Sequence, residues 1–128
     1  MKSIIKEYIG EFTKYMSANG VSTYPLPKVV LRNDPAEAEG IYGKTAYYDP
    51  NQKTIVLYIC GRHPKDIMRS FSHEMIHHDQ NMNGLMTPDK MGEADSNYAQ
   101  NNEHLRKLEE DAYLRGNMVF RDWTDSKK

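Results

Sequence analysis

The segment His73-Glu74-Met75-Ile76-His77 constrains this chain more than any other, because it has the spacing H-E-x-x-H. On a helix, residues i and i+4 lie about 40° apart around the axis, so both imidazoles can point at one metal ion. In this pattern the two histidines bind zinc, and the glutamate acts on water at the metal. The sequence therefore predicts a Zn²⁺ site with His73 and His77 as ligands and Glu74 as the catalytic base.

We expect the motif to lie on one helix from Lys65 to Gln80. Pro64 suits the first turn of such a helix, and Asp66 lies near the positive end of its dipole. The centre of the apolar side of this helix lies about 160° from the histidine side. That apolar side consists of Ile67, Met68, Phe71 and Met75. It should pack on a sheet and turn His73 and His77 toward another part of the chain. The alternative is that both are ordinary histidines of an amphipathic helix.

The rest of the chain predicts an α+β fold in one domain, residues 1–128. Apolar stripes predict a first helix from Ile4 to Met16 and a last helix from about Tyr98 to Met118, which Gly116-Asn117 could end earlier. The tail Thr124–Lys128 should fray. Apolar, β-branched and aromatic residues predict three strands, Lys28–Arg32, Ile41–Tyr48 and Lys53–Cys60.

The last two predicted strands should form a hairpin through Asp49-Pro50-Asn51-Gln52. The second of them is almost continuously apolar and should be buried on both faces, whereas the first is rich in Tyr and Gly and should lie at the edge of the sheet. Ala36–Gly40 predicts a loop or a short helical turn. The polar segment Asn81–Asn97 predicts irregular structure, and its pattern leaves open whether it forms a lid.

Composition narrows the classes of function. The chain has 128 residues, 38% hydrophobic and 27% charged, with a net charge of -1. This balance favours neither nucleic acid nor a membrane surface as a partner, and no apolar run has the length of a membrane span. The N-terminus has no pattern of a signal peptide. The single cysteine, Cys60, excludes an internal disulfide. A single cysteine fits a reducing compartment, so we expect the protein in the cytoplasm. We also expect a monomer.

Two side chains near the motif have ordinary explanations. His78 falls nearer the apolar side of its helix, so we expect a core histidine that hydrogen-bonds to backbone. Cys60 ends an apolar strand, so we expect a small buried side chain and not a metal ligand.

Catalytic zinc usually takes three protein ligands, and the motif supplies two. The third ligand should come from a later helix that packs across the first. The candidates are Asp95, Glu103, His104, Glu109, Glu110 and Asp111.

Helical geometry favours Glu109 among these candidates. The inward side of the last helix consists of Leu105, Leu108, Ala112 and Val119. Glu109 lies within about 60° of the centre of this side, whereas Glu110 lies about 150° away. A carboxylate near a buried stripe costs free energy unless it is paired or binds a metal. Ala112 and Gly116 have little bulk, so the two helices could approach closely. The alternatives are that His104 completes a site of three histidines and that Glu109 is an ordinary surface residue.

His73-Glu74-x-x-His77 followed by Glu109-x-x-Ala112 resembles the gluzincin arrangement of zinc metallopeptidases. The chain is similar in particular to short metallopeptidase-like proteins, many of them encoded by phages. The likeness covers Arg62–Gln80 and Leu105–Trp123. It implies Glu109 as the third ligand and a minimal zincin-like fold, in which a small twisted sheet is backed by helices and its edge strand flanks the active-site cleft.

The sequence departs from larger gluzincins because it lacks the C-terminal domain that usually supplies a transition-state histidine or tyrosine. Tyr113, one turn beyond Glu109 on nearly the same face, is a candidate for this role, although a structural role is the commoner explanation for such a residue. Weaker candidates are His63, Tyr98 and His104.

These observations predict a zinc-dependent peptidase that hydrolyses peptide bonds in a peptide or protein substrate. His73, His77 and Glu109 would hold the zinc ion, Glu74 would take and return the proton, and the substrate would lie extended beside the edge strand. If the chain is phage-encoded, it would act in the host cytoplasm. One alternative is a zinc-binding structural, inhibitory or regulatory phage module with little turnover. Another is a structural domain without metal.

Overall fold

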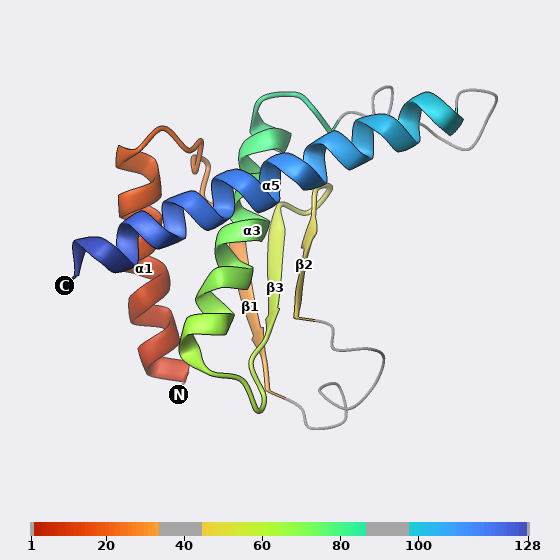
Figure 1. Cartoon of the computed structure of the whole chain (residues 1–128). Coiled ribbons are helices and arrows are strands. Elements are labelled where there is room, and N and C mark those ends of the chain that lie inside the picture. Colours follow the sequence, from red (N-terminus) through yellow and green to blue (C-terminus); the bar gives the residue numbers. More distant parts are fainter. Residues whose placement is uncertain (1, 34–44, 87–97, 128) are drawn as a thin grey trace.

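The computed structural model describes residues 2–33, 45–86 and 98–127. Three helices and a three-stranded sheet form within these residues, and Figure 1 shows their arrangement. The elements are α1 (Lys2–Ala18), β1 (Lys28–Arg32), β2 (Ala46–Asp49), β3 (Thr54–Tyr58), α3 (Pro64–Met82) and α5 (Tyr98–Ser126). The α+β class and the order of elements predicted from the sequence are confirmed.

The sheet is mixed, with the strand order β1-β3-β2. β1 runs parallel to β3, with Lys28 opposite Thr54, and β2 runs antiparallel to β3, with Asp49 opposite Thr54. The predicted hairpin between β2 and β3 is confirmed. The central position of β3 explains its continuous apolar run, since Ile55, Val56 and Leu57 are all buried. β2 lies at the edge of the sheet, as predicted.

The predicted strand ends need small corrections. β3 begins after Lys53, whose positive φ of 49° assigns it to the turn, and ends at Tyr58. Cys60 therefore lies beyond the strand and is only partly buried, whereas the sequence predicted a small buried side chain at the strand end. Predicted strand residues 41–44 and the predicted turn Ala36–Gly40 lie outside the described residues.

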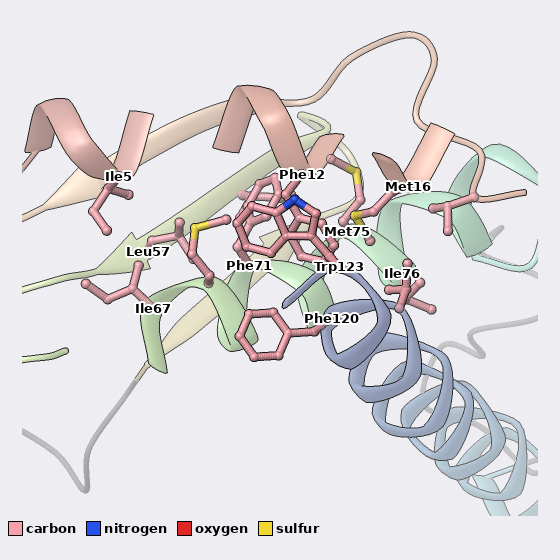
Figure 2. Packing of buried hydrophobic residues seen from close by; sticks show 14 of the residues in the cluster. Ile5, Phe12, Met16, Leu57, Ile67, Phe71, Met75, Ile76, Phe120 and Trp123 are labelled. Atoms are coloured by element: carbon pink, nitrogen blue, oxygen red, sulfur yellow. The ribbon is translucent and has the colours of Figure 1, made fainter. Parts of the chain in front are cut away.

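The three helices meet around an aromatic cluster, shown in Figure 2. Phe12 of α1 stacks on Trp123 of α5, with ring centroids 4.7 Å apart. The rings of Phe71 of α3 and Phe120 of α5 also contact the ring of Phe12, at centroid distances of 6.2 and 6.0 Å. Burying aromatic rings is the largest single source of stabilisation in a small core.

This cluster explains why α5 continues to Ser126 and does not end near Met118. Phe120 and Trp123 are buried, so the segment predicted to lie beyond the helix contributes to the core. Gly116, which the sequence suggested as a stop signal, lies inside the helix where α5 crosses α3. The prediction of an early helix end and a frayed tail was wrong, because tertiary packing overrides the weak helix propensity of glycine.

The layers of the molecule place α3 in the middle. α3 packs on β2 and β3 with one side and on α5 with the other, and Figure 1 shows α5 running across it. α3 also extends past its predicted end, through Met82, and turns follow through Met86. The remainder of the predicted segment Asn81–Asn97, residues 87–97, lies outside the described residues. Within the described part of the chain, no helix has the length and apolar character needed to cross a membrane.

Candidate metal site

α3 carries the H-E-x-x-H motif as predicted, and its start is well defined. His63 is the N-cap residue, and its Nδ1 accepts a hydrogen bond of 3.0 Å from the backbone N–H of Lys65. Pro64 occupies the first turn and Asp66 the positive end of the dipole. His63, a weaker candidate for a transition-state stabiliser, therefore has a structural use as a helix cap.

The apolar side of α3 packs as the sequence predicted. Ile67, Met68, Phe71 and Met75 are all buried. The opposite side is also covered, because α5 lies across it, so His77 is buried and His73 is only partly exposed. The two imidazoles face α5, with ring centroids 4.9 Å apart.

A close approach of α5 sets the distance between the two helices. Ser72 Oγ donates a buried hydrogen bond of 2.7 Å to the carbonyl oxygen of Gly116. Ala112 is completely buried, and the backbone of Gly116 lies against that of His73. The prediction that Ala112 and Gly116 allow close packing is confirmed, and this packing brings Glu109 over the motif.

Glu109 reaches both histidines. Its Oε1 lies 2.7 Å from His77 Nε2, and its Oε2 lies 3.4 Å from His73 Nε2. One ligand atom from each of the three residues lies within 4.8 Å of the others, so the group could hold a metal ion. With bonds of about 2.0–2.1 Å, neighbouring ligands of tetrahedral zinc lie about 3.3 Å apart. The His73–Glu109 distance is close to this value, and the shorter His77–Glu109 distance is that of a hydrogen bond.

Glu109 is more exposed than the sequence predicted, with 55% of its side chain accessible. Helical periodicity gives the direction of a side chain but not its height above the partner helix. Glu109 points toward α3 as expected, yet its carboxylate stands at the rim of the crossing. The cost of burying an unpaired carboxylate therefore does not explain the position of Glu109. Its contacts with His73 and His77 are the observation that links it to the motif.

Glu74 lies beside this group and is buried. Burial, followed by the charge of Glu109, raises the pKa of Glu74 to about 8. Burial and then the neighbouring His77 lower the pKa of His73. Without a cation, the site therefore favours a neutral Glu74 and a neutral His73. A bound cation would lower the pKa of Glu74 again, because positive charge stabilises a carboxylate.

The remaining candidates for the third ligand are not near the motif or have other partners. His104 Nε2 donates a hydrogen bond of 2.8 Å to the carbonyl oxygen of Leu85, so the structure does not bring it to the histidine pair. Glu103 lies 3.8 Å from Lys107, and Glu110 is exposed. Asp111 forms an ion pair with Arg115, which lowers the pKa of Asp111 mainly through their hydrogen bonds. Asp95 lies outside the described residues.

Tyr113 lies next to the site. Its ring packs edge-on against His73 at a centroid distance of 4.7 Å, and 62% of the residue is exposed. Of Tyr98, the structure describes the backbone only. His78 is a core residue whose Nε2 donates to the carbonyl oxygen of Pro25 at 2.7 Å, which confirms its predicted structural role.

A cleft of about 710 Å³ opens over the three residues. One wall is the edge strand β2 with Thr45 and Pro50, and the opposite wall is α5. Leu105, predicted to lie on the inward side of the last helix, is 38% exposed and lines this cleft, whereas the other residues predicted for that side are buried. The α5 wall consists of Leu105, Leu108, Glu109, Tyr113 and Asn117.

The sequence did not identify the partner of His77 on its own helix. Gln80 is completely buried, and its Oε1 lies 2.8 Å from His77 Nδ1. The i, i+3 spacing of the two residues was a usable signal, since such residues are neighbours on a helix surface. The other contacts of Gln80 are on α5, which the sequence of α3 could not show.

Comparison of the chain with protein-family models, curated proteins and solved structures finds no match in any of the three.

Proposed function

We propose that this chain is a zinc-dependent metallopeptidase with a minimal zincin-like fold. The observation that carries the proposal is the convergence of His73, His77 and Glu109 within 4.8 Å, beside a buried Glu74. Two imidazoles and one carboxylate are the protein ligands of many catalytic zinc sites, which keep the fourth position open. The mixed nitrogen and oxygen donors suit zinc better than magnesium or calcium, which prefer oxygen alone.

A zinc ion held by these residues would act as a Lewis acid that lowers the pKa of water to about 7 and polarises a carbonyl group. Glu74 would take a proton from water on its carboxylate and give it to the leaving amine. Without a metal, burial raises the pKa of Glu74 to about 8, and a bound cation would lower it toward neutral pH, where a carboxylate can both take and return a proton. Burial and the nearby cation would act on this pKa in opposite directions.

The edge strand supports an extended peptide as the substrate. Within the described residues β2 pairs only with β3, so its other edge can pair with a further strand. β2 borders the cleft that contains the three candidate ligands. A peptide added beside β2 would pass over these ligands and place its backbone carbonyl groups near them.

Three measurements test the proposal. Protein purified without added metal should contain close to one zinc per chain. It should cleave members of a broad peptide library, and a chelator should abolish the cleavage. Glu74→Gln should retain zinc and lose cleavage, because an amide cannot accept the proton. Full activity of Glu74→Gln, or of the chelated protein, would overturn the proposed mechanism. Stoichiometric zinc without any cleavage would favour the alternative of a zinc-binding module.

A further inference from the structure

The side chain of Gln80 links His77 to α5. It lies one turn after His77 on α3 and is completely buried. Its Oε1 lies 2.8 Å from His77 Nδ1, and its Nε2 lies 2.9 Å from the carbonyl oxygen of Leu108 and 2.9 Å from Asp111 Oδ2. All three contacts have the geometry of hydrogen bonds.

The two partners on α5 determine which way the Gln80 amide points. The carbonyl oxygen of Leu108 can only accept a hydrogen bond. Arg115 donates to both oxygens of Asp111, Nε to Oδ1 and an Nη to Oδ2, each at 2.7 Å, so Asp111 is a carboxylate and also only accepts. The amide NH₂ of Gln80 must therefore face α5, and its oxygen must face His77.

This orientation of the Gln80 amide determines which ring nitrogen of His77 carries a proton. The oxygen of Gln80 can only accept, so His77 Nδ1 must carry a proton and donate it. In the neutral ring the lone pair then lies on Nε2, the atom 2.7 Å from Glu109 Oε1. Two acceptors at this distance repel each other unless a proton lies between them, and a metal ion bound to both atoms would require them to move to about 3.3 Å apart. Nε2 is thus the atom of His77 that is available to bind a metal.

Further ion pairs hold the contact in place. The same Nη of Arg115 also donates to Asp79 Oδ1 at 2.8 Å, and Asp79 Oδ2 accepts a hydrogen bond of 2.7 Å from the backbone N–H of Ser22. Asp79 is buried, so its carboxylate would cost free energy without the hydrogen bonds from Arg115 and Ser22. A continuous series of polar contacts therefore runs from the segment after α1 to His77, and its members stabilise one another.

We infer that Gln80 is a positioning residue for metal binding: held by Leu108 and Asp111, it fixes the ring of His77 in the Nδ1-protonated form and leaves Nε2 to the metal. The inference rests on the metal site proposed above. Hydrogen-bond partners of metal-binding histidines orient the ring, and their removal typically weakens metal binding about 10- to 100-fold.

The first test compares Gln80→Met with Ser72→Ala. Both changes remove a buried side-chain hydrogen bond from α3 to a backbone carbonyl of α5, but only the first removes the acceptor for His77. Zinc affinity is measured by competition with a chromophoric chelator. We expect Gln80→Met to bind zinc about 10- to 100-fold more weakly than the wild type. We expect Ser72→Ala to weaken zinc binding by less than Gln80→Met, because it loosens the helix crossing that positions Glu109 but keeps the contact between Gln80 and the His77 ring.

The outcomes separate the two proposals. If the wild type binds zinc and Gln80→Met binds it equally well, the role of Gln80 is overturned and the metal site stands. If the wild type binds no zinc, the metal site itself is overturned, and the role of Gln80 with it. An equal loss of affinity in Ser72→Ala and Gln80→Met would also overturn the role of Gln80, since the effect would then come from helix packing alone.

A second measurement needs no variant, and a loss of folding in Gln80→Met cannot affect it. The ¹⁵N resonances of the imidazole rings in the zinc-loaded wild type report which ring nitrogen carries the proton. We expect the proton of His77 to be on Nδ1. The ¹⁵N–¹H coupling of this Nδ1–H group should be observable, because the buried hydrogen bond to Gln80 slows exchange of the proton with water. A His77 ring protonated on Nε2, with zinc on Nδ1, would overturn the inference.

Discussion

Gly116 of α5 lies directly against the backbone of His73 in α3: a Cβ atom on Gly116 would be 3.3 Å from His73 Cα. The contact is between helix backbones, so neither side can move away by changing a rotamer. Glu109 lies two turns before Gly116 on the same helix and thus on a similar face. The glycine therefore determines how far the carboxylate of Glu109 stands from the imidazoles.

Gly116→Ala tests this relationship, with Gly10→Ala as the matched control. Both glycines are inside helices, but a Cβ atom on Gly10 would have no neighbour within 4 Å. Gly10→Ala should raise the free energy of unfolding by up to about 1 kcal/mol through helix propensity. Gly116→Ala should lack this gain and weaken zinc binding, because the helices must separate. Denaturant unfolding and a zinc titration measure the two effects. Equal stabilisation by both changes would show that the crossing is not tight.

Under the proposed zinc binding, removal of the metal should destabilise the protein. A ligand that binds only the folded state raises the free energy of unfolding by about 2.7 kcal/mol when its free concentration is 100 times its Kd. The melting temperature should therefore rise with added zinc and fall with a chelator. Glu109→Gln should reduce the effect of zinc by replacing a carboxylate ligand with a neutral amide. Glu110→Gln should leave it unchanged, since Glu110 is exposed and not among the residues that converge on the site. Equal responses of both variants to zinc would exclude Glu109 as a ligand.

The three converging side chains could be predicted from the sequence because helical periodicity fixes directions. The i, i+4 spacing placed His73 and His77 together, and the apolar stripe of the last helix favoured Glu109 over Glu110. The exposure of Glu109 could not be predicted, since it depends on where the two helices cross. Gln80 was missed for the same reason, because its amide is oriented by Leu108 and Asp111 on the other helix.

The strands were predictable from local patterns, but the end of α5 was not. Glycine ends many helices, and Gly116-Asn117 has the composition of such an end. In the structure the same glycine is buried at a helix crossing, where a Cβ atom would lie 3.3 Å from His73 Cα and would push the helices apart. The continuation of α5 depends on Phe120 and Trp123 packing with Phe12 of α1, a contact over more than a hundred residues of sequence.

The raised pKa of Glu74 predicts how the stability of the metal-free protein depends on pH. The pKa is about 8 in the folded protein and 4.5 ordinarily, so the folded state binds more protons than the unfolded state between these values. The free energy of unfolding should therefore fall as the pH rises from about 4.5 to about 8, and level off above. Each pKa unit corresponds to about 1.4 kcal/mol, which gives a loss of a few kcal/mol.

Glu74→Gln isolates this effect from that of His73, whose lowered pKa acts in the opposite direction. With a chelator present, the variant should be more stable than the wild type at pH 8.5 and about equally stable at pH 5. Urea unfolding at the two pH values measures the difference. A difference that stays constant with pH would contradict the raised pKa.

Tyr113→Phe tests the candidate for the transition-state stabiliser under the proposed peptidase activity. The ring contact with His73 is retained in this variant, and only the hydroxyl group is lost. If the hydroxyl donates a hydrogen bond to the charge that develops on the substrate carbonyl, kcat should fall by about 10²- to 10³-fold, as for the loss of one such donor. KM and zinc affinity should change little, since the interaction forms only in the transition state. Tyr24→Phe, at an exposed position outside the cleft, should leave kcat unchanged. An unchanged kcat in Tyr113→Phe would assign Tyr113 to packing against His73 alone.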